Sequence, residues 1–146
     1  MAEQFVSAGY HVVTLNVLGN WEIVGPSASL YPAERVQQAE TYMRTHVERC
    51  HAVGAKAIFY MGPVQVPSGN QIFVQAHPDW LRIRPNGRPD PTPNFANIRS
   101  GYADWLLAQL AYVTREFKVD GFWFDGYAPV HLHTYDEATK RAFREF

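Results

Sequence analysis

The apolar residues of the chain follow two alternating patterns, one typical of buried strands and one typical of amphipathic helices. Short runs rich in β-branched and aromatic residues predict strands at residues 10–17, 55–61 and 119–125. The first run follows Gly9, which we expect to end a short helix over residues 3–8 in a left-handed conformation.

Helices are predicted between these strands. After Pro32, a residue favoured in the first turn of a helix, an apolar stripe runs through Val36, Ala39, Met43, Val47 and Cys50. After Ser100, an expected N-cap, a second stripe runs through Tyr102, Leu106, Leu110, Val113 and Phe117. A last helix is expected to start at Thr134 or Asp136. Residues 64–99 show no regular period, and so long a loop should be functional or contain an unrecognised element.

Strands and helices therefore alternate along the chain, which predicts an α/β fold with parallel strands. Three strands are too few to close a (β/α)8 barrel, which has eight strands and typically about 250 residues. Both ends of the sequence fall within helical patterns. We expect a partial (β/α)8 TIM barrel, with residues 1–146 forming a single incomplete barrel segment of about βα units two to four. The alternative is a small open α/β sheet that is complete in itself.

The third predicted strand carries the most informative residue. Residues 119–126 are typical of a strand that is buried on both faces. Side chains alternate along it, so Phe122 and Phe124 share one face while Trp123 and Asp125 share the other. In a barrel the second face points inwards, and its last residue reaches the rim where active sites form. A charge there is costly without a use or a partner, which predicts a catalytic or substrate-binding carboxylate at Asp125. A structural ion pair or turn is the alternative.

Composition narrows the classes of function. The chain is 47% apolar and 18% charged, which is enough to fill a core. A net charge of −1 gives no electrostatic case for nucleic acid or an anionic membrane, and no window approaches the roughly 18 apolar residues of a membrane span. The aromatic content of 14% suits sugar faces as well as a core. No signal peptide pattern is present, which leaves the localisation unknown.

Several segments taken together resemble a known family. They are residues 77–81 (His-Pro-Asp-Trp-Leu), residues 86–89 (Asn-Gly-Arg-Pro), the helix of Tyr102 and the strand at 119–126. In this order they resemble the hypothetical glycosyl hydrolase 6 family, a group of TIM-barrel proteins akin to α-amylase and fucosidase-like hydrolases. The resemblance covers about residues 9–146. The chain departs from the family after the third strand, where many relatives carry cysteines and this sequence has none.

The resemblance implies glycoside chemistry. In such barrels the carboxylate that ends the fourth strand is usually the nucleophile, which corresponds to Asp125. Glycoside hydrolysis generally needs a second carboxyl group that acts as the acid. In related barrels this group comes from a later strand, so the segment alone is expected to be inactive even where the parent protein is an enzyme. Glu22 is the only other carboxylate near the end of a strand, and we expect it to be a solvated loop residue.

Other polar and aromatic side chains near the strand ends are candidates for substrate binding. Asn16 and Tyr60 could form hydrogen bonds with sugar hydroxyls, and Trp21 could stack on a pyranose ring. His77, in the long aperiodic segment, could donate to a sugar hydroxyl or to the catalytic carboxylate. Tyr127 closely follows the third strand. For each of these residues an ordinary loop or core contact is the alternative.

No metal and no cofactor is predicted. His131 and His133 lie beyond the end of the third strand, and only Asp136 is an obvious third ligand. Asp120, at the entry of that strand, is expected to be a turn residue. The sequence thus predicts a segment of a barrel glycoside hydrolase with a carbohydrate substrate; the alternative is a non-catalytic carbohydrate-binding or scaffold module. Open sheet edges favour self-association.

Overall fold

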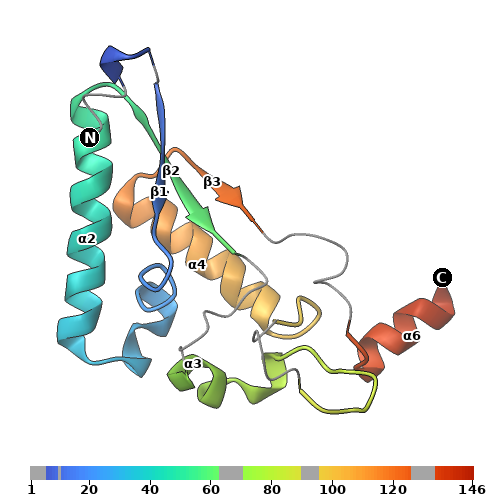
Figure 1. Cartoon of the computed structure of the whole chain (residues 1–146). Helices are drawn as coiled ribbons and strands as arrows, with labels where there is room; N and C mark the ends of the chain where they lie inside the picture. The colour runs from blue at the N-terminus through green and yellow to red at the C-terminus, as the bar shows by residue number, and fades with distance from the viewer. Residues whose placement is uncertain (1–5, 10, 63–70, 90–95, 126–133) are drawn as a thin grey trace. The chain divides into compact units, whose positions relative to one another are not determined.

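In the computed structural model of this chain, the residues described are 6–9, 11–62, 71–89, 96–125 and 134–146. The chain divides into two compact units, one comprising 1–61 with 108–125 and the other 62–107 with 126–146. The first unit contains a parallel sheet, and the second contains short helices and connecting segments (Figure 1).

Three parallel strands form the sheet of the first unit (Figure 1). They are β1 (Val12–Asn16), β2 (Lys56–Met61) and β3 (Gly121–Phe124), with β2 in the centre. Each lies within a predicted strand and is shorter than predicted, β1 and β3 at both ends and β2 at its start. Helix α2 (Ala33–Ala52) connects β1 to β2, and helix α4 (Tyr102–Phe117) precedes β3. The predicted α/β fold with three parallel strands and intervening helices is therefore confirmed.

The register of the strands gives this sheet a covered and an open face, because paired residues of parallel strands point to the same side. The covered face carries Ala57, Phe59 and Met61 of β2, which are fully buried and lie on the side of α2. The open face carries the alternate residues, which are exposed or half-buried: Val12, Thr14, Asn16, Ile58, Tyr60 and Trp123.

Helix α2 confirms four of the five positions of the predicted stripe, because its buried residues are Ala39, Met43, Val47 and Cys50, whereas Val36 is half-buried. Pro32 is the N-cap residue, one position before the first-turn position predicted for it. Ser100 lies one residue before the N-cap position of α4, and its hydroxyl accepts a hydrogen bond of 3.2 Å from the N–H of Tyr102, the first residue of this helix. Gly9 has a φ of 88°, the left-handed conformation expected at a helix end.

The predicted stripe of α4 is wrong at two positions. The buried residues of this helix are Tyr102, Trp105, Gln109, Val113 and Phe117, whereas Leu106 and Leu110 are half-buried. The polar Gln109 occupies the centre of the stripe because its amide nitrogen donates hydrogen bonds to the carbonyl oxygens of Trp21 and Val24. These hydrogen bonds to the loop after β1 therefore determine which side of this part of α4 faces the interior.

Strand β3 also differs from its prediction as a strand buried on both faces. Trp123 is 57% exposed and Phe124 is 42% exposed. The physical reason is the position of β3 at the edge of the sheet, where among the described residues it pairs only with β2. The apolar character of the run predicted burial, but the described elements do not cover both faces of this strand.

Residues 64–99 contain unrecognised elements, which is the second of the two alternatives expected for this stretch. This stretch contains a short helix, α3 (Gln71–Ala76), and a 3-10 turn, η2 (Pro78–Trp80). Neither was predicted, because one turn or two is too short to establish an apolar period. Their aromatic side chains form a cluster with those of the first turn of α4: Phe73, His77, Trp80, Tyr102 and Trp105.

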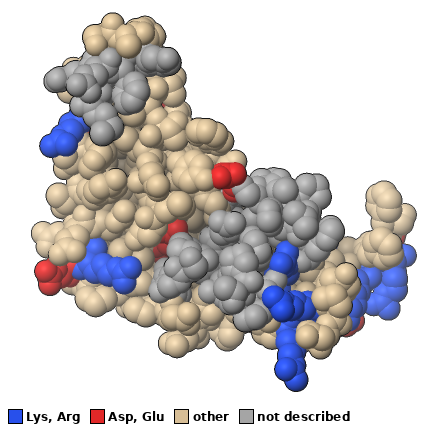
Figure 2. All heavy atoms as spheres, viewed as in Figure 1, with Lys and Arg blue, Asp and Glu red and all other residues tan. Residues whose placement is uncertain are grey.

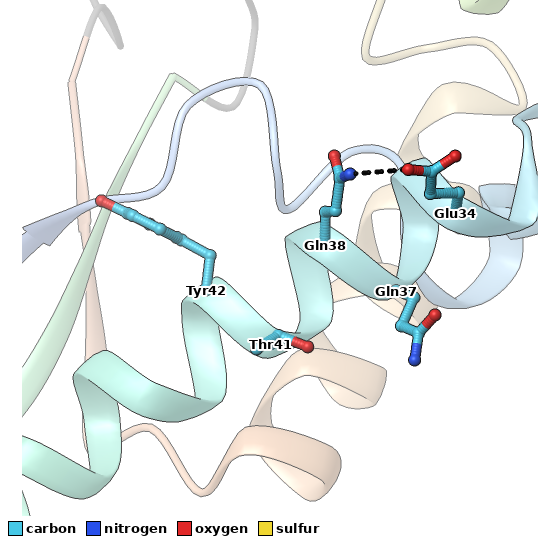
Figure 3. Close-up of a pocket in the computed structure, with 5 residues that line it drawn as sticks. All are labelled: Glu34, Gln37, Gln38, Thr41 and Tyr42. Atoms are coloured by element: carbon cyan, nitrogen blue, oxygen red, sulfur yellow. Dashed lines mark hydrogen bonds between the residues drawn. The ribbon is translucent and has the colours of Figure 1, made fainter.

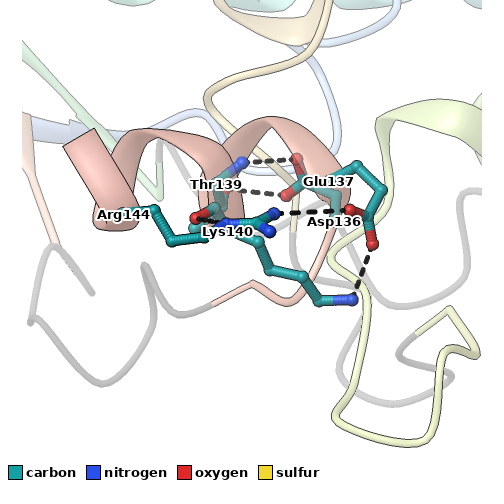
Figure 4. A network of polar contacts seen from close by, with 5 residues as sticks. All are labelled: Asp136, Glu137, Thr139, Lys140 and Arg144. Atoms are coloured by element: carbon teal, nitrogen blue, oxygen red, sulfur yellow. Dashed lines mark hydrogen bonds and ion pairs between the residues drawn. The ribbon is translucent and has the colours of Figure 1, made fainter.

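The last helix, α6 (Glu137–Glu145), starts at the second of its two predicted positions. The carboxylate of Asp136 accepts hydrogen bonds of 3.0 Å from the N–H and 2.8 Å from the hydroxyl of Thr139, which makes Asp136 the N-cap (Figure 4). Glu137 pairs with Lys140 at 2.8 Å within the same helix. These contacts account locally for the helix start.

Candidate functional site

Side chains at the C-terminal ends of the strands meet on the open face of the sheet. Asp125 directly follows β3, and its N–H donates a hydrogen bond of 2.9 Å to the carbonyl of Met61. The strand alternation therefore continues to this residue and places its carboxylate on the same face as Trp123. Asn16 and Tyr60 are register partners on that face. Three of the predicted site residues, Asn16, Tyr60 and Asp125, thus lie at one edge of the sheet.

The side chain of Tyr60 is hydrogen-bonded to that of Asp125. The phenol donates a hydrogen bond to Oδ2 of the carboxylate. This bond, with desolvation and the negative charge of Asp125, raises the pKa of Tyr60 above its usual value. The ring of Tyr60 also meets the indole of Trp123 edge to face, with centroids 5.7 Å apart at 89°. One tyrosine therefore contacts both the carboxylate and the exposed indole.

Asn16 is the last residue of β1 and is already engaged in local structure. Its side-chain oxygen accepts a hydrogen bond of 3.1 Å from the N–H of Leu18, which forms a turn at the strand end. Its backbone carbonyl accepts a bond of 3.3 Å from the hydroxyl of Tyr42 on α2. Figure 3 shows Tyr42 reaching from the helix towards this strand. These bonds fix the position of Asn16 at the rim.

Trp21 does not have the exposure that stacking on a sugar requires. Its exposed fraction is 0%, and its carbonyl accepts a bond from Gln109. The interpretation of Trp21 as a stacking platform is therefore corrected to that of a core residue. The cause lies in the loop after β1, which folds back onto the unit and continues into a 3-10 helix, η1 (Gly25–Leu30). Trp21 becomes part of the core under this loop.

Glu22 lies in the same loop, and the expectation that it is solvated is wrong. It is 2% exposed, and neither carboxyl oxygen forms a hydrogen bond of good geometry with the described residues. Desolvation raises its pKa from 4.5 to about 8, only partly opposed by the N–H groups of Glu22 and Gly19 and the indole of Trp21. At neutral pH this side chain is a neutral carboxylic acid inside the first unit.

The opposite ends of the strands carry a different carboxylate with a structural role. Asp120 accepts hydrogen bonds from Lys56 at 2.7 Å, from His51 at 2.8 Å and from the N–H of Ala57 at 2.9 Å. Desolvation raises the pKa of Asp120, but these bonds outweigh it and hold the pKa well below the usual value. Asp120 is therefore more than a turn residue, since it joins the end of α2 to the starts of β2 and β3.

The remaining predicted residues lie elsewhere. His77 belongs to the second unit, where its ring stacks on Trp80 with centroids 3.7 Å apart and planes at 6°. This contact agrees with the alternative interpretation of His77 as a packed loop residue. Tyr127, His131 and His133 lie outside the described residues.

A hollow on α6 is lined by Glu137, Arg141 and Arg144. A shallow hollow on α2 is lined by side chains of that helix alone (Figure 3): Glu34, Gln37, Gln38, Thr41 and Tyr42. No group of three or more potential metal ligands occurs among the described residues. None of the described helices is long and apolar enough to cross a membrane. Figure 2 shows a face on which most described atoms are neither acidic nor basic.

The fold resembles those of solved glycoside hydrolases. The maltogenic α-amylase from Thermotoga neapolitana superposes with a TM-score of 0.63 at 19% identity, over 90% of this chain and 35% of the amylase. The β-galactosidase from Marinomonas ef1 gives a TM-score of 0.63 at 18% identity, over 99% of this chain and 22% of the galactosidase. The α-galactosidase from Lactobacillus brevis gives 0.60 at 18% identity, over 85% and 17%.

At these identities the similarity establishes the fold alone. The chain has a partial (β/α)8 TIM-barrel fold, as predicted, and spans between 17% and 35% of the lengths of these three proteins. No family model and no curated protein sequence matches the chain. The likeness is therefore to glycoside-hydrolase barrels in general, and the resemblance to one particular family stays a prediction.

Proposed function

We propose that this chain forms part of a glycoside-hydrolase barrel in which Asp125 is the catalytic carboxylate. The position of Asp125 carries the proposal. It directly follows β3, on the open face of the sheet, in a fold shared with glycosidases. Catalytic residues of β/α barrels occupy this position at the C-terminal ends of strands. We place the segment at about βα units two to four of the barrel.

Asp125 would act as nucleophile or stabilise the positive charge of an oxocarbenium-like transition state. Tyr60 supports either role, because its hydrogen bond orients the carboxylate. The phenol of Tyr60 carries its proton at neutral pH, and the raised pKa of Tyr60 only extends this to higher pH. A donor that is fixed in advance costs no reorganisation during the reaction.

Hydrolysis also requires a second carboxyl group about 5 Å from the first for retention, or farther away for inversion. Among the described strands and the residues that directly follow them, Asp125 is the only carboxylate at the C-terminal edge. Glu22 is buried. We therefore propose that the acid comes from polypeptide outside this sequence and that the segment alone does not turn over substrate. The same observation favours the second candidate, a non-catalytic carbohydrate-binding or scaffold module.

The test is turnover of a panel of aryl α- and β-glycosides by the chain and by its reading frame extended in both directions. Each protein is compared with its Asp125→Asn variant, and Asp79→Asn, which changes an exposed carboxylate of η2, is the matched control. Turnover by the extended protein that is lost in Asp125→Asn and kept in Asp79→Asn would support the proposal. Equal turnover in both variants would refute the role of Asp125, and sugar binding without turnover would favour the binding module.

A further inference from the structure

The sequence contains one Asn-Gly pair, Asn86-Gly87. In such a pair the side-chain amide of asparagine is open to attack by the next backbone nitrogen, because glycine has no Cβ to obstruct the approach. Residues 84–89 are all exposed, and a Cβ added to Gly87 would meet nothing within 4 Å. Solvent therefore has access to both residues of the pair.

The pair lies at the tip of a hairpin in the second unit. Ile83 and Pro89 form an antiparallel bridge, and the N–H of Arg84 donates a hydrogen bond of 2.8 Å to the carbonyl of Arg88. The N–H of Gly87 donates one of 2.9 Å to the carbonyl of Arg84, and the φ of Gly87 is 78°. This is the pattern of a tight turn followed by a left-handed glycine. Such an exposed tip opens locally at little cost.

The side chain of Asn86 is turned back towards the main chain. Its Oδ1 accepts a hydrogen bond of 3.1 Å from the N–H of Arg88. This Asx turn folds the amide group over the intervening peptide, which contains the nitrogen of Gly87. The N–H of Arg88 also lies where negative charge would develop on Oδ1 if Cγ were attacked, which is the position of an oxyanion donor.

We propose that Asn86 is a site of spontaneous deamidation, at which the backbone nitrogen of Gly87 attacks Cγ of Asn86. The bond from this nitrogen to Cγ forms, the bond from Cγ to Nδ2 breaks, and the proton of the attacking nitrogen leaves with the amide group as ammonia. Water then opens the cyclic imide at either carbonyl and yields aspartate or isoaspartate. Water is the only co-reactant. The N–H of Gly87 must first leave the carbonyl of Arg84, so the reaction proceeds from the opened turn. This inference is independent of the proposed function.

The modification has a structural consequence beyond the hairpin tip. Isoaspartate adds a carbon to the main chain between Asn86 and Gly87, which disturbs the pairing of the hairpin. Ile83 in this hairpin is also bonded to the residues before α6. Its N–H donates a hydrogen bond of 3.0 Å to Oγ1 of Thr134, and its carbonyl accepts one of 2.9 Å from the N–H of Tyr135. Isoaspartate at position 86 therefore weakens the attachment of these residues to the hairpin.

The experiment incubates the folded chain in ¹⁸O-enriched water at neutral pH and at one pH unit higher, and digests it in ordinary water. Peptide mass spectrometry then locates each lost amide, and the heavy oxygen shows that the loss preceded digestion. Asn16 is the matched internal control. It is exposed and its Oδ1 accepts a bond of 3.1 Å from the N–H of Leu18, but the residue after it is the buried, β-branched Val17.

We expect Asn86 to be converted while Asn16 in the same sample stays intact. The rate should rise by up to about tenfold per pH unit, because the attacking nitrogen must lose its proton. Asn86→Gln should stay intact at this position, since its cyclic imide would need a larger ring. Hydrogen exchange at the N–H groups of Ile83 and Tyr135 should be faster in the isoaspartate fraction than in Asn86→Asp, which has the charge but an unaltered main chain.

Three results would overturn these inferences. Equal conversion of Asn16 and Asn86 would show that the turn confers no selectivity. Conversion of Asn86 only in chain unfolded by guanidinium chloride would show that the folded turn prevents the reaction. Equal hydrogen exchange in the isoaspartate fraction and in Asn86→Asp would refute the weakened attachment of the residues before α6.

Discussion

The burial of Glu22 can be tested quantitatively through the pH dependence of stability, because ionisation of a buried acid opposes folding. Its pKa is raised from 4.5 to about 8 in the folded chain. The folded state therefore holds the proton more tightly than the unfolded state, and stability decreases as pH rises between these two values. The slope is about 1.4 kcal/mol per pH unit where only the unfolded state is ionised. Below 4.5 both states are protonated, so the effect disappears.

Replacing Glu22 by Gln tests this, since the amide is neutral at every pH and has nearly the same volume. Across the roughly 3.5 pH units between the two pKa values, the full penalty reaches about 5 kcal/mol. At pH 7 about 3 kcal/mol of it is present. We expect Glu22→Gln to gain stability over the wild type steadily from pH 5 to pH 8.

The assay is urea unfolding followed by tryptophan fluorescence at several pH values, with the difference between variant and wild type as the readout. Other groups such as Asp120 titrate equally in both proteins and cancel in that difference. Glu48→Gln, an exposed position on α2, should shift the wild-type curve by a constant amount. If the difference for Glu22→Gln is as flat with pH as that for Glu48→Gln, Glu22 is not a buried neutral acid and the reasoning fails.

Three further predictions follow from single contacts. Asp125→Asn should lower the pKa of Tyr60 towards its usual value, as a phenolate titration by ultraviolet absorbance would show, with Tyr60→Phe identifying the signal. Asp120→Asn should destabilise the chain by about 1–3 kcal/mol at neutral pH. This loss of stability should shrink as the pH falls through and below 3.8, because the hydrogen bonds that lower the pKa of Asp120 stabilise only its ionised form. Gly25→Ala should cost about 2–4 kcal/mol in urea unfolding, since φ is 57° and a Cβ would lie 2.5 Å from the ring of Tyr112; a loss below 1 kcal/mol would contradict the close packing.

The sequence was sufficient to predict features that depend on local chemistry. Such features include the glycines that bound the strands, the proline before α2 and the hydroxyl at the start of α4. Each of these influences only the few residues next to it in the chain. The position of Asp125 on the same face as Trp123 also followed from alternation along one strand. The hydrogen bond between Asp125 and Tyr60 did not, because it depends on the register between two strands and joins residues that are 65 positions apart in the chain.

The burial of polar residues could not be predicted in the same way. Gln109 was missed because an apolar stripe excludes it, although the set Tyr102, Trp105, Gln109 and Val113 has helical spacing when Gln is allowed. Glu22 was missed for a related reason. It stands in the otherwise apolar run from Trp21 to Val24, a pattern that signals burial of the whole loop, but its charge in water argued for exposure. Both errors come from treating polar side chains as solvated unless a partner is visible in the sequence.

The two carboxyl groups that follow strands of the sheet cannot serve as the catalytic pair in the conformation described. Asp125 stands on the open face with a phenol donor, whereas Glu22 is 2% exposed and kept neutral by its surroundings. A neutral acid has the protonation state that a glycosidase acid needs, but a group without access to the open face cannot reach a glycosidic oxygen there. Glu22 could take part only if the loop after β1 opened, and the burial of Trp21 beside it makes that opening costly. Under the proposed function the acid is therefore a carboxyl group other than Glu22, and Glu22→Gln should retain turnover in the extended protein.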